Sequence, residues 1–357
     1  MYDLMPPTIT PQKKRFGWLR RPMVVIPLAL AIILLGLVGG AFWVNHWYTN
    51  ALKPLSQTEQ RMRVTVPKGA DAAQIGKILQ DKQIIRNARA FEQYVSRSHN
   101  KSNLQAGTYL LSPSFSVQKI VDMLAGGEVD AYNLTLTPGK YLDQISASLV
   151  KAGFDQTELQ TALAKKYDHP LFADKPANAD LEGYIFPDTY HLDSQANAEK
   201  FLTTTFDTFW KHIQDEGIVD KLKAHGLTLY QGITLASIVQ KEVSNPEDQK
   251  IVAQVFLSRL QKNISLGSDV TYMYASHKAG VADNITIDSP YNTRLHKGLP
   301  PGPIANFNMS ALEAVANPSP TDYLFFVAGD DGKVYYSHTH EEHEALTKQY
   351  CTKLCQE

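Results

Sequence analysis

An apolar run without charges, close to the amino terminus, is the feature that most limits how this chain can fold. No charged side chain occurs from Pro22 to Asn45, and the segment from Met23 to Val44 reads MVVIPLALAIILLGLVGGAFWV. This is about the 20 residues that a helix needs to cross ~30 Å of hydrocarbon. The sequence therefore predicts one transmembrane helix at 23–44, since no second run of that length follows.

The residues on either side of this run indicate its orientation. Five basic residues precede it: Lys13, Lys14, Arg15, Arg20 and Arg21. By the positive-inside rule, residues 1–22 form a basic cytoplasmic tail and the rest of the chain is exported. The alternative is a cleaved signal peptide, whose apolar region usually has only ~7–15 residues before a small-residue cleavage site. The longer run here ends in the bulky WVNHWY, which favours an uncleaved anchor.

Charge and cysteine content exclude several classes of protein. Lys plus Arg number 35 and Asp plus Glu 36, so the net charge of −1 argues against a nucleic-acid binder, which usually carries a basic excess. The two cysteines, Cys351 and Cys355, are too few for a disulfide framework or a cysteine-rich zinc site. Whether these two cysteines pair with each other stays open.

The exported part begins with a polar stretch at 45–62, which we interpret as a short stalk, and then shows a repeating unit. Each copy has a β-type run, a Pro/Gly turn and apolar residues at helical spacing. The copies are VTVPKGADAAQIGKILQDKQII from Val64, GTYLLSPSFSVQKIVDMLAGG from Gly107 and YNLTLTPGKYLDQISASLVKAG from Tyr132. Such units resemble LysM-type glycan-binding modules, although ordinary α+β units without a ligand would read the same way.

Further helices are predicted in the second half of the chain, at about 196–224 and 228–243. The clearest start signal is Asn245-Pro246-Glu247-Asp248, which combines a capping residue, a proline at the first position and acids in the first turn. The helix that it opens is expected to run to Gln261. We therefore predict an α+β protein with a small LysM-like α+β subdomain at 63–130 and a larger mixed α/β domain at 131–357.

One carboxyl group continues an apolar stripe. In LYQGITLASIVQKEVS, residues Leu235, Ile238 and Val239 share one helix face, and the next position on that face is Glu242. Burial disfavours an ionised carboxylate and raises its pKa, which is what a general acid needs near neutral pH. The alternative is that Glu242 simply ends the helix and is exposed to solvent.

Other segments with reactive or polar side chains give weaker signals. The run SHTHEEHEAL contains His338, His340 and His343, but the zincin pattern needs histidines at i and i+4, so we expect no metal here. The segment from Tyr291 to Thr293 and the loop GLPPGP at 298–303 could bind a sugar or could be a tight connection. No phosphate-loop or dinucleotide signature occurs, and no cofactor is expected.

Taken together, the motifs match one family. They are VPKGADAAQI, LQAGTYLL, LEGYIFPDTY, LASIVQKE, LGSDVTYMY, SPYNTRLHKGLPPGPIANF and YLFFVAGDDGKVYYS, in this order from about residue 60 onward. With its N-terminal anchor, the chain resembles the endolytic murein transglycosylases of the YceG-like (MltG) family. The resemblance implies a single-pass enzyme of the inner membrane, with a periplasmic body in which a LysM-like subdomain precedes a YceG-like catalytic domain. The resemblance implies nascent peptidoglycan glycan strands as its substrate partner and the peptidoglycan synthases as candidate protein partners.

The resemblance also suggests roles for individual residues. The family's catalytic acid is the last Glu of a motif similar to ASIVEKE, which is Glu242 here, while Gln240 replaces the earlier Glu. This one carboxyl group would protonate the bond between N-acetylmuramic acid and N-acetylglucosamine and leave a 1,6-anhydro end, without a cofactor. Candidates for lining the cleft, from the family motifs, are Asp188, Asp269, Tyr274, Tyr291, Asn292 and Thr293.

Two alternatives to a lytic transglycosylase stay open. A muramidase that uses water would need a second carboxylate, for which Asp269 or Asp188 would serve. A glycan-binding scaffold of the cell-wall synthesis machinery would need no catalytic residue at all. The intact motif around Glu242 favours an enzyme over the scaffold.

Overall fold

The apolar run folds as part of a long helix, α1 (Pro22–Ala51), in the computed structural model, which describes residues 22–98, 104–127, 132–192, 197–353 and 355. The helical segment from Ile26 to Ala51 contains an 18-residue stretch with a mean hydropathy of 2.3, and within the described residues it is the one helix long and apolar enough to span a membrane. Its length and composition fit either a membrane anchor or a signal sequence. The predicted basic tail, apart from Pro22, lies outside the described residues.

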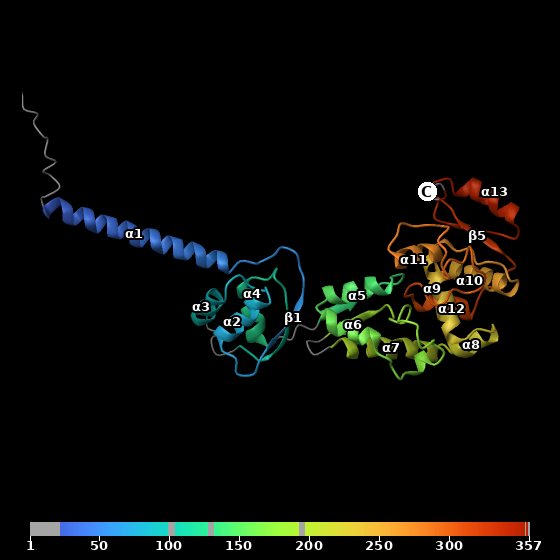
Figure 1. The fold of residues 1–357 in the computed structure, drawn as a ribbon, viewed down its shortest axis with the longest axis horizontal. Coiled ribbons are helices and arrows are strands. Elements are labelled where there is room, and N and C mark those ends of the chain that lie inside the picture. Colours follow the sequence, from blue (N-terminus) through green and yellow to red (C-terminus); the bar gives the residue numbers. More distant parts are fainter. Residues whose placement is uncertain (1–21, 99–103, 128–131, 193–196, 354, 356–357) are drawn as a thin grey trace, which may run out of the picture.

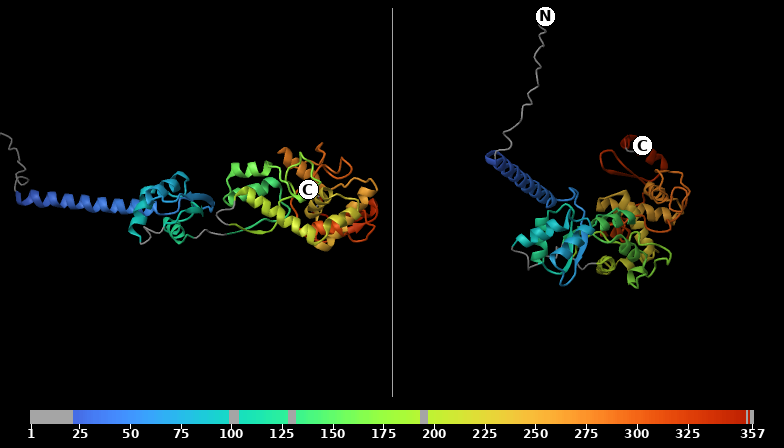
Figure 2. Two further views of the ribbon diagram at one scale, coloured as in Figure 1. Left: turned by 90° about the horizontal axis from the view of Figure 1, so that it is seen from below. Right: turned by 60° about the vertical axis from the view of Figure 1, so that its left-hand side comes forward.

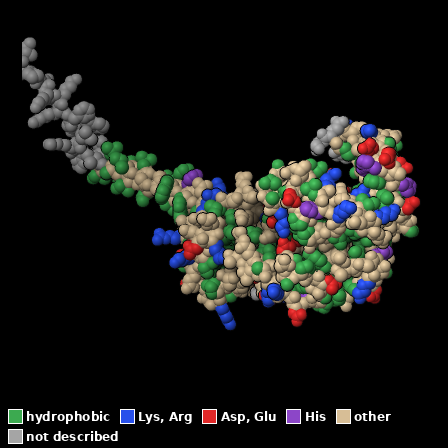
Figure 3. All heavy atoms as spheres, turned by 45° about the vertical axis from the view of Figure 1, so that its right-hand side comes forward, with side chains coloured by type: hydrophobic (Ala, Val, Ile, Leu, Met, Phe, Trp, Pro, Cys, Tyr) green, Lys and Arg blue, Asp and Glu red, His purple; other side chains and the backbone are tan. Residues whose placement is uncertain are grey.

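The helix projects from the rest of the molecule (Figure 1). Figure 3 shows hydrophobic side chains along its outer surface, whereas Lys, Arg, Asp and Glu are spread over the remainder of the protein. The helix continues beyond the predicted 23–44 span, and Ala51 at its end is buried. The following residues are bonded to the protein, since Leu52 O accepts the backbone N–H of Val117 and Leu55 N–H donates to Pro113 O. The segment interpreted as a stalk therefore lies against the folded body.

Residues 62–126, called here the small unit, contain the first two copies of the repeat. Its elements are β1 (Met62–Val66), α2 (Ala72–Asp81), α3 (Ala88–Arg97), β2 (Gly107–Leu111) and α4 (Val117–Gly126). β1 pairs antiparallel with β2, with Val64 opposite Tyr109. The observed β1, α2, β2 and α4 confirm the strands and helices predicted in these copies, and the small unit has its own cluster of buried apolar side chains. The sequence patterns had not indicated α3, which Asn87 caps by accepting the backbone N–H of Ala90.

Residues 132–353, called here the large unit, are mostly helical. Its elements are β3 (Tyr132–Thr135), α5 (Leu142–Lys151), α6 (Gln156–Ala164), the 3₁₀ turn η2 (Pro170–Phe172), β4 (Thr189–Leu192), α7 (Ala198–Asp215), α8 (Ile218–Ala224), α9 (Leu229–Glu242), α10 (Pro246–Gln261), α11 (Asp269–Ala279), α12 (Met309–Ala316), β5 (Phe325–Ala328), β6 (Val334–Ser337) and α13 (His340–Tyr350). The third repeat copy forms as β3 and α5, but β3 pairs antiparallel with β4.

The protein is thus mixed α+β, as predicted, but the large unit is not built on an α/β sheet. The sheets of the described residues are two-stranded and antiparallel: β1–β2, β3–β4 and β5–β6. Its core is helical instead, since α9 is buried from Gly232 to Val239 and packs against α8, α10, α11 and α12. A helix buried on all sides is covered by other helices rather than by one face of a sheet. Figure 2 shows the helices of the large unit, in green to red, from two further directions.

Local sequence signals account for how α9 is followed by α10. Thr228 and Gln231 form a capping box that begins α9. Asn245 accepts the backbone N–H groups of Glu247 and Asp248, and Pro246 occupies the first helical position of α10, which ends at Gln261. The predicted bounds of α10 are confirmed. The sharp turn between the two helices places the last residue of α9, Glu242, where the chain changes direction.

The two cysteines form a disulfide after α13, between Cys351 and Cys355. The sequence alone had left this pairing open. The disulfide lies next to the β5–β6 hairpin, because Asp330, in the turn of that hairpin, donates its backbone N–H to Tyr350 O and accepts the backbone N–H of Thr352. It closes a short segment at one end of the large unit.

Candidate functional site

Glu242 is the centre of the candidate site. It ends α9, and although the residue keeps some exposed surface, protein atoms enclose its carboxyl group. Burial raises the pKa of Glu242 to about 7, and the nearby charge of Asp269 acts in the same direction. The negative end of the α9 dipole also disfavours an ionised group at this position. The carboxyl group can therefore hold a proton near neutral pH.

Three polar neighbours oppose this rise in the pKa. The hydroxyl of Ser268 donates a hydrogen bond of 2.5 Å to Oε1 of Glu242. The guanidinium groups of Arg294 and Arg259 lie near enough to favour the ionised form electrostatically. Glu242 is therefore protonated readily near neutral pH but keeps partners that can stabilise the carboxylate once the proton has left.

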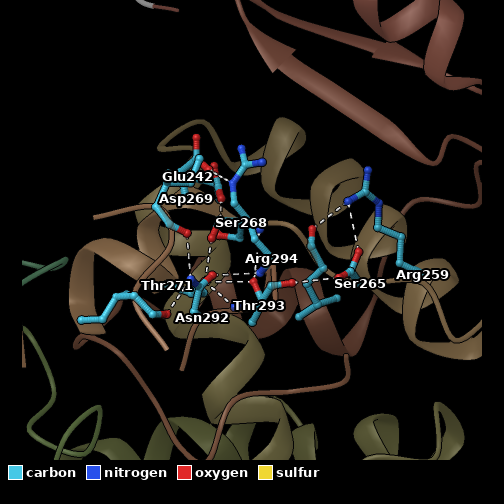
Figure 4. A network of polar contacts seen from close by, with 12 residues as sticks. Glu242, Arg259, Ser265, Ser268, Asp269, Thr271, Asn292, Thr293 and Arg294 are labelled. Carbon is cyan, nitrogen blue, oxygen red and sulfur yellow. Dashed lines mark hydrogen bonds and ion pairs between the residues drawn. The ribbon is translucent and has the colours of Figure 1, made fainter. Parts of the chain in front are cut away.

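Thr293 holds the loop that presents Ser268 (Figure 4). Its hydroxyl accepts the backbone N–H of Ser268 at 3.2 Å and lies 2.9 Å from the hydroxyl of Thr271. Its carbonyl oxygen accepts the backbone N–H of Gly267 at 3.0 Å. Thr293 is buried, so the contacts described for it fix the position of the loop behind the carboxyl group.

Asn292 holds the neighbouring segment through hydrogen bonds of its side chain. Its side-chain amide donates to the backbone carbonyl oxygens of Ile285 at 2.9 Å and Ile287 at 3.0 Å, and its Oδ1 accepts the backbone N–H of Arg294 at 3.1 Å. The residue is fully buried. Asn292 and Thr293, proposed from the family motifs to line the cleft, bond to the protein in this structure and position other groups.

The two arginines of the site come from different elements. Arg294 Nε lies 2.5 Å from Oδ1 of Asp269, the first residue of α11, in a half-exposed ion pair. Arg259 on α10 donates to the carbonyl oxygens of Leu266 at 2.7 Å and Leu324 at 2.6 Å. Arg259 thereby connects the loop before Ser268 to the segment that leads into β5. The carboxylate of Asp269 is occupied by its ion pair with Arg294.

The other predicted residues are distributed unequally. Tyr274 on α11 is buried and donates its hydroxyl to Oε2 of Glu182 at 3.1 Å, and half-buried Tyr291 packs edge-on against it with ring centroids 5.0 Å apart. Asp188 is exposed just before β4, where its Oδ1 accepts the backbone N–H of Thr189. The structure therefore brings Asp269, Asn292 and Thr293 into the network around Glu242. The hydrogen bonds and ion pairs described for Asp188 lie outside that network.

Sequence reasoning missed four residues near the predicted ones, namely Glu182, Arg259, Ser268 and Arg294. Two of them carried a usable signal. Glu182 interrupts the otherwise apolar and aromatic LEGYIF, and Ser268 directly precedes Asp269 in LGSDV at the position that caps α11. The substituted position Gln240 faces elsewhere, since its Oε1 accepts the backbone N–H of Asn308 at the start of α12.

The histidines of the C-terminal segment have ordinary partners. His338 lies 3.0 Å from Asp322 and His340 lies 3.4 Å from Glu344, while His343 stacks on Phe325. Across the residues that the structure describes, no cluster of His, Cys, Asp or Glu is arranged to hold a metal ion.

Known proteins similar to this chain identify its family. The model of the YceG-like family matches residues 64–349, which span both units and the whole Glu242 network. The chain belongs to the YceG-like family. A crystal structure of the yceG-like protein lmo1499 from Listeria monocytogenes has 32% sequence identity and a TM-score of 0.54, covering 80% of this chain and 99% of that one.

Two relatives of this YceG-like protein are both named endolytic murein transglycosylases. The endolytic murein transglycosylase of Bacillus subtilis (strain 168) is 31% identical over 333 residues, which are 88% of this chain and 91% of the relative. The endolytic murein transglycosylase of Streptococcus pneumoniae serotype 2 (strain D39 / NCTC 7466) is 29% identical over 352 residues, which cover 89% of this chain and 63% of that longer relative.

Proposed function

We propose that this YceG-like protein is a membrane-anchored lytic transglycosylase that cleaves peptidoglycan glycan strands internally. The observation that carries the proposal is Glu242, an enclosed carboxyl group with a pKa raised to about 7, at the end of a buried helix. A carboxyl group in this state can donate a proton at neutral pH and be stabilised as an anion afterwards. The relatives named endolytic murein transglycosylases supply the substrate class.

The proposed reaction uses one carboxyl group twice. Glu242 protonates the oxygen of the β-1,4 bond between N-acetylmuramic acid and N-acetylglucosamine, and the bond breaks through an oxocarbenium-like state at C1 of the muramic acid. The Glu242 carboxylate, held by Ser268, then takes the proton of the C6 hydroxyl of that same sugar. The hydroxyl oxygen attacks C1 and closes a 1,6-anhydro ring. An internal nucleophile carries the proximity advantage that a bound water would otherwise have to supply.

The surroundings of Glu242 favour this reaction over hydrolysis by a muramidase. A water-using enzyme needs a second carboxylate as base or nucleophile. Of the two carboxylates considered for that role, Asp269 is paired with Arg294, and the described bonds of Asp188 lie elsewhere in the large unit. A scaffold that only binds glycan would not need a general acid, and the relatives of this chain are named transglycosylases.

The remaining features suggest where the reaction takes place. We propose that α1 is an uncleaved inner-membrane anchor, with the N-terminus in the cytoplasm and the body in the periplasm. In the same proposal, residues 63–130 form a LysM-like subdomain and residues 131–357 the catalytic domain. Cleavage of nascent strands would end their elongation, which makes the peptidoglycan synthases natural partners. The separate apolar cluster of the small unit supports this division.

Digestion of purified glycan strands with the full-length protein in detergent is the direct test. We expect mass spectrometry to find 1,6-anhydro-muramic acid at the new ends, with products from the interior of the strands. Reducing muramic acid ends would instead support the muramidase, and unchanged strands would support the scaffold.

The pH dependence of cleavage follows from the pKa of Glu242. The acid must be protonated to donate, so activity is expected to fall as the pH rises through about 7. The Ser268→Ala variant loses a hydrogen bond that stabilises the carboxylate, so its pKa should rise further. We expect the alkaline limb of the rate profile to move upward by about one pH unit.

The control for this measurement is Ser265→Ala, a serine in the same loop whose hydroxyl donates to the carbonyl oxygen of Thr293 rather than to Glu242. Its alkaline limb should coincide with that of the wild type. A rate that stays constant from about pH 5 to pH 9 would contradict a protonated Glu242 as the acid.

A further inference from the structure

A cavity lined by aromatic and polar side chains lies next to the Glu242 network, between α5 and α11. Its volume is about 370 Å³. Two of its walls are the aromatic rings of Tyr141 and Tyr274, which meet edge to face with centroids 5.4 Å apart. Glu182 also lines it and is only 5% exposed. The cavity therefore combines apolar ring surfaces with a deeply placed carboxyl group.

The bonding of Glu182 is incomplete. Its Oε2 accepts two hydrogen bonds, from the backbone N–H of Leu142 at 3.2 Å and from the hydroxyl of Tyr274 at 3.1 Å. Its Oε1 is buried and has no hydrogen-bond partner among the described residues. A buried polar atom left in this state requires an explanation, because such atoms are nearly always bonded.

The cations of the cavity do not complete this bonding. Lys278 pairs with Asp180 at 3.1 Å, and His277 pairs with Asp143 at 2.7 Å. Both pairs lie at the exposed rim. The rim charges are thus balanced among themselves, and the open acceptor of Glu182 is left for a group that enters the cavity.

We propose that this cavity is a subsite for an N-acetylated sugar of the glycan strand, whose acetamido N–H or hydroxyl group donates to Oε1 of Glu182. The tyrosine rings offer faces and edges against which a sugar ring packs. Burial raises the pKa of Glu182 to about 7, so at pH 8, where binding is to be measured, Oε1 is mainly an ionised acceptor for such a donor. The proposal rests on the glycan substrate proposed above.

The position of the subsite fits a strand bound in its interior. Ser268, which bonds to Glu242, directly precedes α11, and Tyr274 lies six residues later, about 9 Å along the helix axis. Lys241, next to Glu242 in the chain, has its ammonium group 4.9 Å from the ring centre of Tyr141. A sugar in the cavity would belong to the same strand as the cleaved bond, but not to that bond itself.

Binding to an inactive protein tests the subsite separately from catalysis. The probe is a peptide-free glycan octasaccharide, and the parent is the full-length Glu242→Gln protein in detergent, studied by calorimetry. Adding Ser146→Phe fills the cavity from α5, whereas the matched Ala147→Phe places the same ring on the exposed side of that helix. We expect the Kd to rise about tenfold for Ser146→Phe and to stay unchanged for Ala147→Phe.

A second variant tests the carboxyl group itself. Glu182→Gln keeps an oxygen for Leu142 and Tyr274 but places an amide donor at the open position, so the Kd should again rise about tenfold. Equal Kd values for the Ser146→Phe and Ala147→Phe proteins, or no binding by the parent, would overturn the subsite. So would a Glu182→Gln protein that melts earlier but binds as the parent does. Reducing ends in the wild-type digest would overturn the proposed reaction alone.

Discussion

Glu242→Gln is expected to lower the rate of glycan-strand cleavage by about 10³-fold, because the variant has no proton to donate. Glutamine has nearly the same shape and can still accept the hydrogen bond of Ser268, so substrate binding should change little. The loss is therefore expected in kcat rather than in KM, and the measurement is the rate at which 1,6-anhydro ends appear. The matched control is Glu247→Gln, an exposed carboxylate at the start of α10 that pairs with Lys250.

The same variant should not be less stable than the wild type, which separates catalysis from misfolding. Folding raises the pKa of Glu242 from its ordinary value of 4.5 to about 7. The protonated carboxyl group therefore favours the folded state at low pH, and that contribution is lost as the pH rises through about 7. Glu242→Gln is expected to gain of the order of 1–3 kcal/mol over the wild type at pH 8, but not at pH 4. An active Glu242→Gln protein would rule out this residue as the acid.

Gly183→Ala is expected to lower the free energy of unfolding by roughly 2–5 kcal/mol. Gly183 has a φ of +79°, a conformation that costs an alanine about 1–2 kcal/mol. An added Cβ would also lie 2.5 Å from Cβ of Pro303, whose ring cannot rotate away. Because Gly183 follows Glu182, the strain would fall where LEGYIF packs against GPIANF. Denaturant unfolding followed by circular dichroism measures the change.

Gly217→Ala is the control for the backbone effect alone. Gly217 has a φ of +59°, and a Cβ built there meets no atom within 4 Å. This variant should lose only about 1–2 kcal/mol. Equal losses for the two variants would mean that the contact with Pro303 adjusts freely, and the larger part of the prediction for Gly183 would be wrong.

The sequence predicted best what depends on nearby residues. Asn245 and Pro246 defined the start of α10, and the apolar spacing that led to Glu242 followed from the period of one helix. The long helix α1 was visible from hydropathy, but its continuation to Ala51 was not, because residues 45–51 are polar in part and end against the small unit. Elements that are stabilised by contacts between residues far apart in the sequence are not visible in a local pattern.

The candidate site divides in the same way. Glu242 could be singled out from its own helix, whereas the contact from Ser268 spans 26 positions and depends on a loop held by Thr293. Asn292 and Thr293 were considered for sugar binding because amides and hydroxyls suit sugars, but the same groups also bond to backbone carbonyl and N–H groups. Residue type alone cannot distinguish these two uses. The expectation of a mixed α/β domain is met only in part: helices and strands both occur, but the described sheets of the large unit are two-stranded and antiparallel, and local periodicity does not show which strands pair.

The attachment of residues 52–56 to the small unit bears on where along a strand the enzyme can cut. Pro113 O accepts the backbone N–H groups of Leu55 and Ser56, and Arg86 donates to Pro54 O at 2.7 Å. Across the next junction, the guanidinium of Arg63 lies 4.4 Å from the ring centre of Phe154 on the large unit. If α1 is the anchor, these bonds keep the small unit next to the membrane-spanning helix, and the contact of Arg63 with Phe154 brings part of the large unit beside it. A strand bound by the large unit would then be cut in its membrane-proximal part.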